Sequence, residues 1–145
     1  MTSRRELIVR DIVDTLKNQQ TVRFGTVSRD PGLEIQDLAN TAFPAVIVES
    51  GTETRESITQ MGASQRRQAT MSVNITVWIN STPRADTQRN DLIEQIEELL
   101  DADPTRGGNS FDTQLTEIEP GGDTAPYESM ELVFTIPYVY TKGNP

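Results

Sequence analysis

The clearest pattern in the chain is a strict alternation of apolar and polar residues in "MSVNITVWIN", residues 71–80. Successive side chains of a β-strand point to opposite faces, so this period of two predicts a strand with one buried face. Trp78, the only tryptophan, falls on the other face, beside Asn74 and Thr76. The residues predicted to face the core are Met71, Val73, Ile75, Val77 and Ile79.

Two segments instead carry the helical period. Residues 3–19, "SRRELIVRDIVDTLKNQ", begin with Ser3 and Glu6 at capping-box spacing. Residues 81–104 contain the most regular helical pattern, which Pro104 and the glycine pair 107–108 bring to an end. Each helix has one apolar stripe. The stripes comprise Ile8, Val9, Ile12, Val13 and Leu16 in the first helix, and Leu92, Ile93, Ile96, Leu99 and Leu100 in the second.

Two further strands are predicted between the first helix and the alternating strand. A short one runs from Val22 to Thr26 and is followed by the turn "RDPG". "PAVIVESG", residues 44–51, is a near-continuous apolar run, typical of a strand that is central or covered on both faces. Residues 52–70 are polar and join two strong strands. They are predicted to form the outer part of a long hairpin with its tip near "MGASQRR", or else a solvent-exposed loop.

The last two strands follow the second helix. "FDTQLTEIEPGGD", residues 111–123, is predicted to be a strand that leads into a Gly-rich turn, with Phe111, Thr113 and Leu115 on one side. In "ESMELVFTIPYVYTK", residues 128–142, Pro137 has no backbone N–H to donate to a neighbouring strand, so the strand is expected to be at an edge or irregular there. One face of this strand would carry Met130, Leu132, Phe134, Ile136, Tyr138 and Tyr140.

These elements predict an α+β fold: a mostly antiparallel β-sheet with two α-helices packed on one face and a long β-hairpin. At 145 residues the chain is expected to form a single domain, 1–145. No apolar run is long enough for a membrane span, and the N-terminus does not have the pattern of a signal peptide.

Composition narrows the possible chemistry. The chain has no cysteine and no histidine, which excludes disulfides and thiolate catalysis and removes the commonest general base and metal ligand. Glu117 and Glu119 would share a strand face and Asp101, Asp103 and Asp112 lie close in sequence, but a solvated face and a helix end explain these acids better. We therefore predict no enzyme activity, no catalytic residue, no cofactor and no metal.

Charge points instead to assembly. The net charge is −9, so duplex nucleic acid should be repelled unless the basic residues are segregated. Arginines flank the predicted hairpin tip, and a basic tip with an acidic helix face on one molecule favours a head-to-tail contact between copies. Trp78 is either covered by a helix or loop or used in an assembly contact. The predicted interface residues are Arg55, Arg66, Arg67 and Trp78.

The order and texture of these elements resemble the tail-terminator family of long-tailed bacteriophages, the minor tail protein U type. The segments that carry the resemblance are "RRELIVRDIVDTLK", "FPAVIVESGTE", "RRQATMSVNITVWI", "NDLIEQIEELLDAD" and "ESMELVFTIPYVYTKG". It covers most of the chain and is weakest from Thr105 to Pro126. It is a pattern of elements, and it transfers no functional residue.

The resemblance implies a virion structural protein of the tail and neck, assembled in the host cytoplasm. Such proteins form a ring, usually a hexamer, on the head-proximal end of the tail tube, where they stop polymerisation and dock the head. The implied partners are further copies of the chain, the tail tube protein, a head–tail connector or neck protein, and a sheath in tails that have one. DNA would pass through the lumen without specific binding, and no membrane is implied. The hairpin and "DPTRGGNS", residues 103–110, would become ordered on ring closure.

Three alternatives remain at this stage. Another neck protein, such as a head-completion protein or connector adaptor, would bind a portal-side partner instead of the tube. A carboxylate-only hydrolase would need two buried acids with separated pKa values. A nucleic-acid-binding module would show salt-dependent binding.

Overall fold

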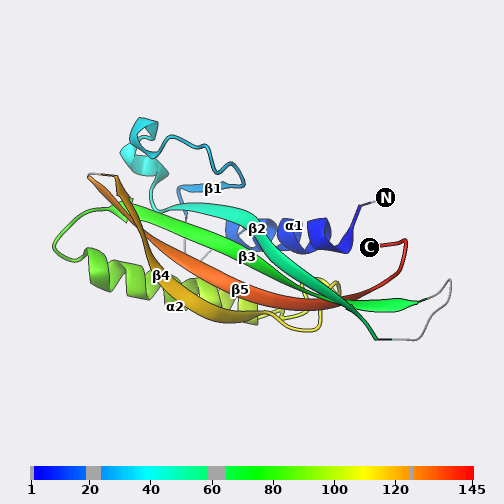
Figure 1. Cartoon of the computed structure of the whole chain (residues 1–145). Coiled ribbons are helices and arrows are strands. Elements are labelled where there is room, and N and C mark those ends of the chain that lie inside the picture. Colours follow the sequence, from blue (N-terminus) through cyan, green and yellow to red (C-terminus); the bar gives the residue numbers. More distant parts are fainter. Residues whose placement is uncertain (1, 19–23, 59–64, 125) are drawn as a thin grey trace.

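The computed structural model describes residues 2–18, 24–58, 65–124 and 126–145, and its centre is one five-stranded sheet (Figure 1). The strand order is β1-β2-β3-β5-β4. β1 pairs with β2 in parallel, and all other neighbours are antiparallel. The elements in chain order are α1 (Arg4–Lys17), β1 (Thr26–Ser28), single-turn 3-10 helices at Ile35–Asp37 and Asn40–Ala42, β2 (Ala45–Ser57), β3 (Arg66–Asn80), α2 (Ala85–Asp101), β4 (Gln114–Thr124) and β5 (Tyr127–Thr141).

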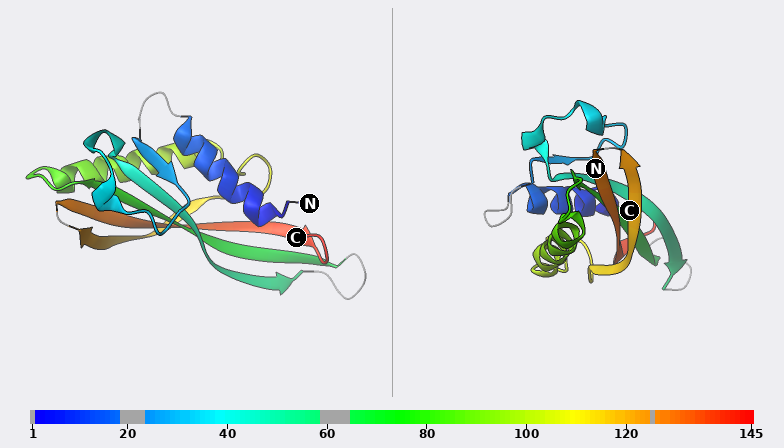
Figure 2. Two further views of the ribbon diagram at one scale, coloured as in Figure 1. Left: turned by 90° about the horizontal axis from the view of Figure 1, so that it is seen from above. Right: turned by 90° about the vertical axis from the view of Figure 1, so that its left-hand side faces the viewer.

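Both helices pack on the same face of the sheet, as predicted, and bury their apolar stripes in one core (Figure 2). α1 begins where the capping pattern placed it, because the Ser3 hydroxyl accepts a hydrogen bond from the Glu6 amide at 3.2 Å. α2 ends at Asp101, before Pro104. The strands contribute the alternating residues of β3 and β5 to the core. Neither helix in the described part of the chain is long and apolar enough to cross a membrane.

β2 has two halves with different surroundings. Its first four residues, 45–48, are all buried, because α1 covers one face and the segment Leu33–Phe43 packs against the other. This confirms the prediction of a strand covered on both faces. The strand does not stop at Gly51 but continues past a bulge between Ser50 and Glu53.

The outer half of β2 pairs with the start of β3 as far as Ser57 and Arg67, which confirms the long hairpin. Figure 1 shows this hairpin extending beyond both helices. We call its described outer part, residues 53–58 and 65–71, the arm. Arg66 and Arg67 belong to β3, whereas the predicted tip included them; the rest of the predicted tip lies mostly outside the described residues.

The first strand is β1, Thr26–Ser28, later than the predicted Val22–Thr26; Val22 lies outside the described residues. The turn that follows has the expected chemistry, since the Asp30 carboxylate accepts a hydrogen bond from the Gly32 amide at 2.9 Å.

The region before β5 departs most from the prediction. Phe111 is 58% exposed and lies outside β4, which begins at Gln114. Gly121 is not in a turn: it lies within β4 at a bulge between Pro120 and Asp123. A β-carbon at Gly121 would lie 2.1 Å from the Ser129 hydroxyl, so this position requires glycine for close strand approach rather than for chain reversal.

Pro137 fits its predicted environment. β4 begins opposite Thr135, so β5 has no β4 neighbour beyond that residue and is locally an edge strand where Pro137 occurs. The prediction of an α+β fold with two helices on one face of a mostly antiparallel sheet is therefore confirmed.

Candidate assembly interface

The arm is held by a buried carboxylate with three hydrogen-bond donors. Glu53 accepts hydrogen bonds from Arg5 and from the Tyr138 hydroxyl, each at 2.8 Å, and from Arg55. Burial alone would raise the pKa of Glu53, but the hydrogen bonds from Arg55, Tyr138 and Arg5 outweigh it and lower that pKa. Burial and the Glu53 contact raise the pKa of Tyr138 to about 12. Because Arg5 belongs to α1, this cluster ties the base of the arm to the helical layer.

The three predicted arginines come together at this end of the molecule but do not share one face. Arg55 lies over the Tyr140 ring, with its guanidinium carbon 4.8 Å from the ring centroid. Arg67 pairs with Tyr140 in the sheet, and its Nε is shielded from solvent without a hydrogen-bond partner among the described residues. Arg66 is exposed, and the alternation of the strand directs it to the face opposite Arg67. Arg55 pairs with Glu53 of its own chain. Contact of Arg66 and Arg67 with another copy stays a prediction.

Trp78 lies about 36 Å from Arg67 along β3, at roughly 3.3 Å per residue, so the two cannot belong to one small contact. It is half-buried in a second apolar cluster, on the face of the sheet away from the helices. In this cluster the rings of Phe43 and Tyr127 stack with centroids 4.6 Å apart. The loop cover that was one of the two alternatives is thus present, and a role for Trp78 in assembly stays a prediction. The other members of the cluster are Leu33, Ile35, Leu38 and Ile47.

Acidic side chains gather on the other side of the molecule, along α2 and β4. These two elements hold nine acidic residues and one arginine, a net charge of −8 out of −9 for the whole chain. Between them lies an open groove of about 280 Å³. Its exposed apolar residue is Ile118, 48% accessible. The groove, called the acidic groove below, is lined by Ile93, Glu97, Leu115, Thr116, Glu117 and Ile118.

The paired carboxylates of β4 lie on the surface, as the solvated interpretation predicts. Glu117 and Glu119 are both exposed. A hydrogen bond shared with Glu119, together with the charge of that carboxylate, raises the pKa of Glu117. Among the residues that the structure describes, no group of three or more acidic side chains is placed to hold a metal ion.

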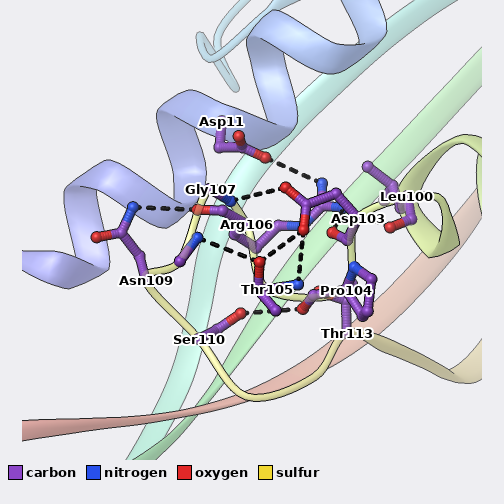
Figure 3. A network of polar contacts seen from close by, with 11 residues as sticks. Asp11, Leu100, Asp103, Pro104, Thr105, Arg106, Gly107, Asn109, Ser110 and Thr113 are labelled. Atoms are coloured by element: carbon purple, nitrogen blue, oxygen red, sulfur yellow. Dashed lines mark hydrogen bonds and ion pairs between the residues drawn. The ribbon is translucent and has the colours of Figure 1, made fainter.

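The residue that sequence reasoning missed is Arg106, in the loop between α2 and β4. Its side chain is fully buried, and its guanidinium donates to the carbonyl oxygens of Leu100 and Asp103 at the end of α2 (Figure 3). It also forms an ion pair with Asp11 of α1, with 3.2 Å between Nη1 and Oδ1. A cation at a helix C-terminus is favourable because unpaired carbonyls and the helix dipole meet there. Arg106 therefore locks both helices to this loop.

The same loop is braced by a second set of contacts. Asp103 accepts hydrogen bonds from the Thr105 amide and hydroxyl and from the Gly107 amide, and these bonds lower the pKa of Asp103. The Ser110 and Thr113 hydroxyls both donate to the Pro104 carbonyl, at 3.1 and 2.9 Å. The expectation that residues 103–110 have little to bury alone is therefore wrong: the isolated chain orders this loop around Arg106.

Comparison with known proteins bears on the fold alone. No protein-family model matches the chain, and no curated protein matches its sequence. Solved structures similar in fold include the following chain. It is a chain from the virion of a native gene transfer agent particle, with a TM-score of 0.56 and 12% sequence identity. The match covers 89% of this chain and 92% of that one, so the two share nearly their entire fold.

Proposed function

We propose that this chain is a structural protein of a phage-like virion, and specifically a tail terminator. It would form a ring on the head-proximal end of the tail tube, stop tube polymerisation and provide the surface on which the neck docks. The observation that carries the proposal is the fold shared, over 89% of the chain, with a protein chain of a gene transfer agent virion. The resemblance of the element order to tail terminators adds the specific role.

Surface charge supports self-assembly in this proposal. Net negative charge is concentrated on α2 and β4, while three arginines lie on the arm. Copies related by a rotation that brings unlike surfaces together form heterologous contacts, and these close into rings when the rotation allows. An acidic chain also suits a passage for DNA, because it does not hold the phosphate backbone. The proposed role involves no turnover.

The experiment begins with the oligomeric state. Light scattering across a concentration series, with negative-stain images of the same sample, should reveal a closed ring with a central hole. If the protein is monomeric alone, it is mixed with tail tubes of its own particle, and density at one tube end together with arrested elongation is expected. A compact two-fold dimer that neither forms rings nor binds tube ends would contradict the proposal. Binding to the connector but not to the tube would favour a different neck protein.

A further inference from the structure

We propose that the arm of one copy docks in the acidic groove of the next, with Ile58 as its apolar anchor. The inference rests on the proposed function, since it specifies how a ring of this protein is joined. The two surfaces lie on different parts of the molecule: the arm extends past the helices at one end, whereas the groove lies between α2 and β4 (Figure 1). A contact between them is head-to-tail and leaves the joined pair with one free groove, on the first copy, and one free arm, on the second.

The groove has an apolar floor with an acidic rim. Ile93 and Leu115 lie at its base as members of the helix-side core, and Ile118 is 48% exposed. Glu97 of α2 and Glu117 of β4 stand at its margins. An exposed isoleucine between carboxylates is suited to a partner that brings one apolar side chain flanked by cations.

The arm offers that combination. Ile58 directly follows β2 and is 47% exposed, and its amide donates to the Arg66 carbonyl at 3.1 Å. This backbone bond places Ile58 beside Arg66 at the start of β3, with Arg67 next along the strand on its other face. Between residues 53 and 67 the chain has three arginines and two glutamates, and Arg55 and Glu53 pair with each other. Outside that pair the segment has two arginines and one glutamate, so it stays net basic. The occupant that matches the groove in charge and apolar content is therefore the arm of a second copy.

Side chains rather than added strands would make this contact. The outer edge of β4 has no neighbour in the described sheet, yet it carries Pro120, two register shifts and several acidic residues. Proline, bulges and charge are the features by which edge strands avoid pairing with another strand. The groove beside that edge is thus the accessible part of this surface.

Cysteine cross-linking tests the contact directly, because the chain has no cysteine of its own. The double variant Ile58→Cys/Ile118→Cys is oxidised over a range of protein concentrations and run on non-reducing gels. A ladder of dimers, trimers and larger species, or a closed oligomer, is expected because every copy then has one thiol on each side of the contact. The matched control is Ile58→Cys/Asp91→Cys, whose second thiol lies on the exposed face of α2 outside the groove.

The ladder should be at least tenfold stronger in the test variant than in the control at equal concentration. A ladder no stronger than in the control, or dimers through position 58 alone, would overturn the proposal. Because cross-linking also captures weak encounters, the test decides even if the free protein is monomeric.

Charge exchange provides a second, independent readout. Arg66→Glu/Arg67→Glu disables the arm, and Glu97→Lys/Glu117→Lys disables the groove. Each variant alone should fail to assemble, whereas an equimolar mixture should assemble with alternating copies, because the Glu arm matches the Lys groove and the Arg arm matches the unchanged acidic groove. Combining all four substitutions in one chain should restore the wild-type behaviour. Independent assembly of the groove variant at wild-type concentrations would refute the contact.

Outcomes for the interface and for the proposed function are separable. If the ladder forms but tube ends are neither bound nor blocked, the arm–groove contact stands and the terminator role fails. If the protein forms rings that cap tubes while the cross-link is absent, the role stands and the contact is wrong.

Discussion

Arg106→Ala should lower the free energy of unfolding by about 3–5 kcal/mol, because a fully buried side chain loses its hydrogen bonds to the end of α2. Two hydrogen bonds from the charged guanidinium to Leu100 and Asp103 carbonyls are lost, each about 1.5–3 kcal/mol. Asp11 adds little to the cost, because its side chain is 28% exposed and water replaces the lost ion pair. For a chain of 145 residues this corresponds to a decrease in Tm of about 10–15 °C.

The assay is urea unfolding followed by the fluorescence of Trp78, the only tryptophan, at a concentration where the protein sediments as a monomer. Arg10→Ala is the matched control: it removes an exposed arginine that pairs with Glu6 at 2.9 Å on α1, and should cost less than about 1 kcal/mol. Arg106→Lys should fall between the two, since an ammonium cannot reproduce the planar fork of donors. A loss below about 1 kcal/mol for Arg106→Ala would show that the guanidinium does not hold this loop, and would refute the reasoning.

Three further predictions concern stability. Gly121→Ala should lower the free energy of unfolding in urea by about 1–3 kcal/mol, because its β-carbon would lie 2.1 Å from the buried Ser129 hydroxyl. The control Gly122→Ala should be near neutral, because a β-carbon there meets nothing within 4 Å. Equal effects of the two substitutions would contradict the close approach at Gly121. The pKa of Glu53 in the folded protein lies below its ordinary 4.5, so the stabilisation from this carboxylate is present above pH 4.5 and is lost as the pH falls through the folded pKa. Glu53→Gln should therefore make the free energy of unfolding less dependent on pH on the acid side. Parallel stability curves for the variant and the wild type would argue against this role of Glu53. Ser3→Ala should cost about 1 kcal/mol by removing the N-cap of α1, and an unchanged urea midpoint would show that the cap is dispensable.

The periodicity of apolar residues was sufficient to predict the helices and strands that bury only one face. The alternation at Met71–Ile79 and the stripe at Leu92–Leu100 each encode a single buried face, so the strand and helix were found with the correct orientation. For the arm the sequence left a hairpin and a solvent-exposed loop open, and the pairing of β2 with β3 decides for the hairpin.

Two of the failures, at Gly121 and Arg106, come from contacts between residues distant in sequence or element, and the third, at Phe111, comes from an apolar residue that stays exposed. Phe111 is apolar but exposed, so its pattern suggested a strand where none forms. Gly121 has the local chemistry of a turn, yet its role is set by Ser129 on the neighbouring strand. Arg106 is polar and is followed by two glycines, and only the meeting of α1 with the end of α2 explains its burial. No sequence signal short of co-variation with Asp11 could have identified it.

The two surfaces of the proposed contact could be read from the sequence only in part. A basic arm and an acidic helix face were both readable from sequence, whereas the groove required β4 to lie beside α2. Ile58 and Ile118 were not singled out, because one exposed isoleucine in a polar stretch carries no periodic signal.

Charge distribution limits the ways in which copies of this protein can associate. A two-fold dimer through α2 and β4 would bring together elements whose residues sum to a net charge of −8 in each copy, and this repulsion grows as the ionic strength falls. A head-to-tail contact instead pairs that surface with arginines and becomes stronger at low salt, while the apolar part contributed by Ile58 persists at high salt. Assembly by the proposed route should therefore weaken, but not vanish, as salt is raised from about 0.05 to 0.5 M. Association that strengthens steadily with salt over this range would mean that apolar burial dominates and that the arginines of the arm do not select the partner.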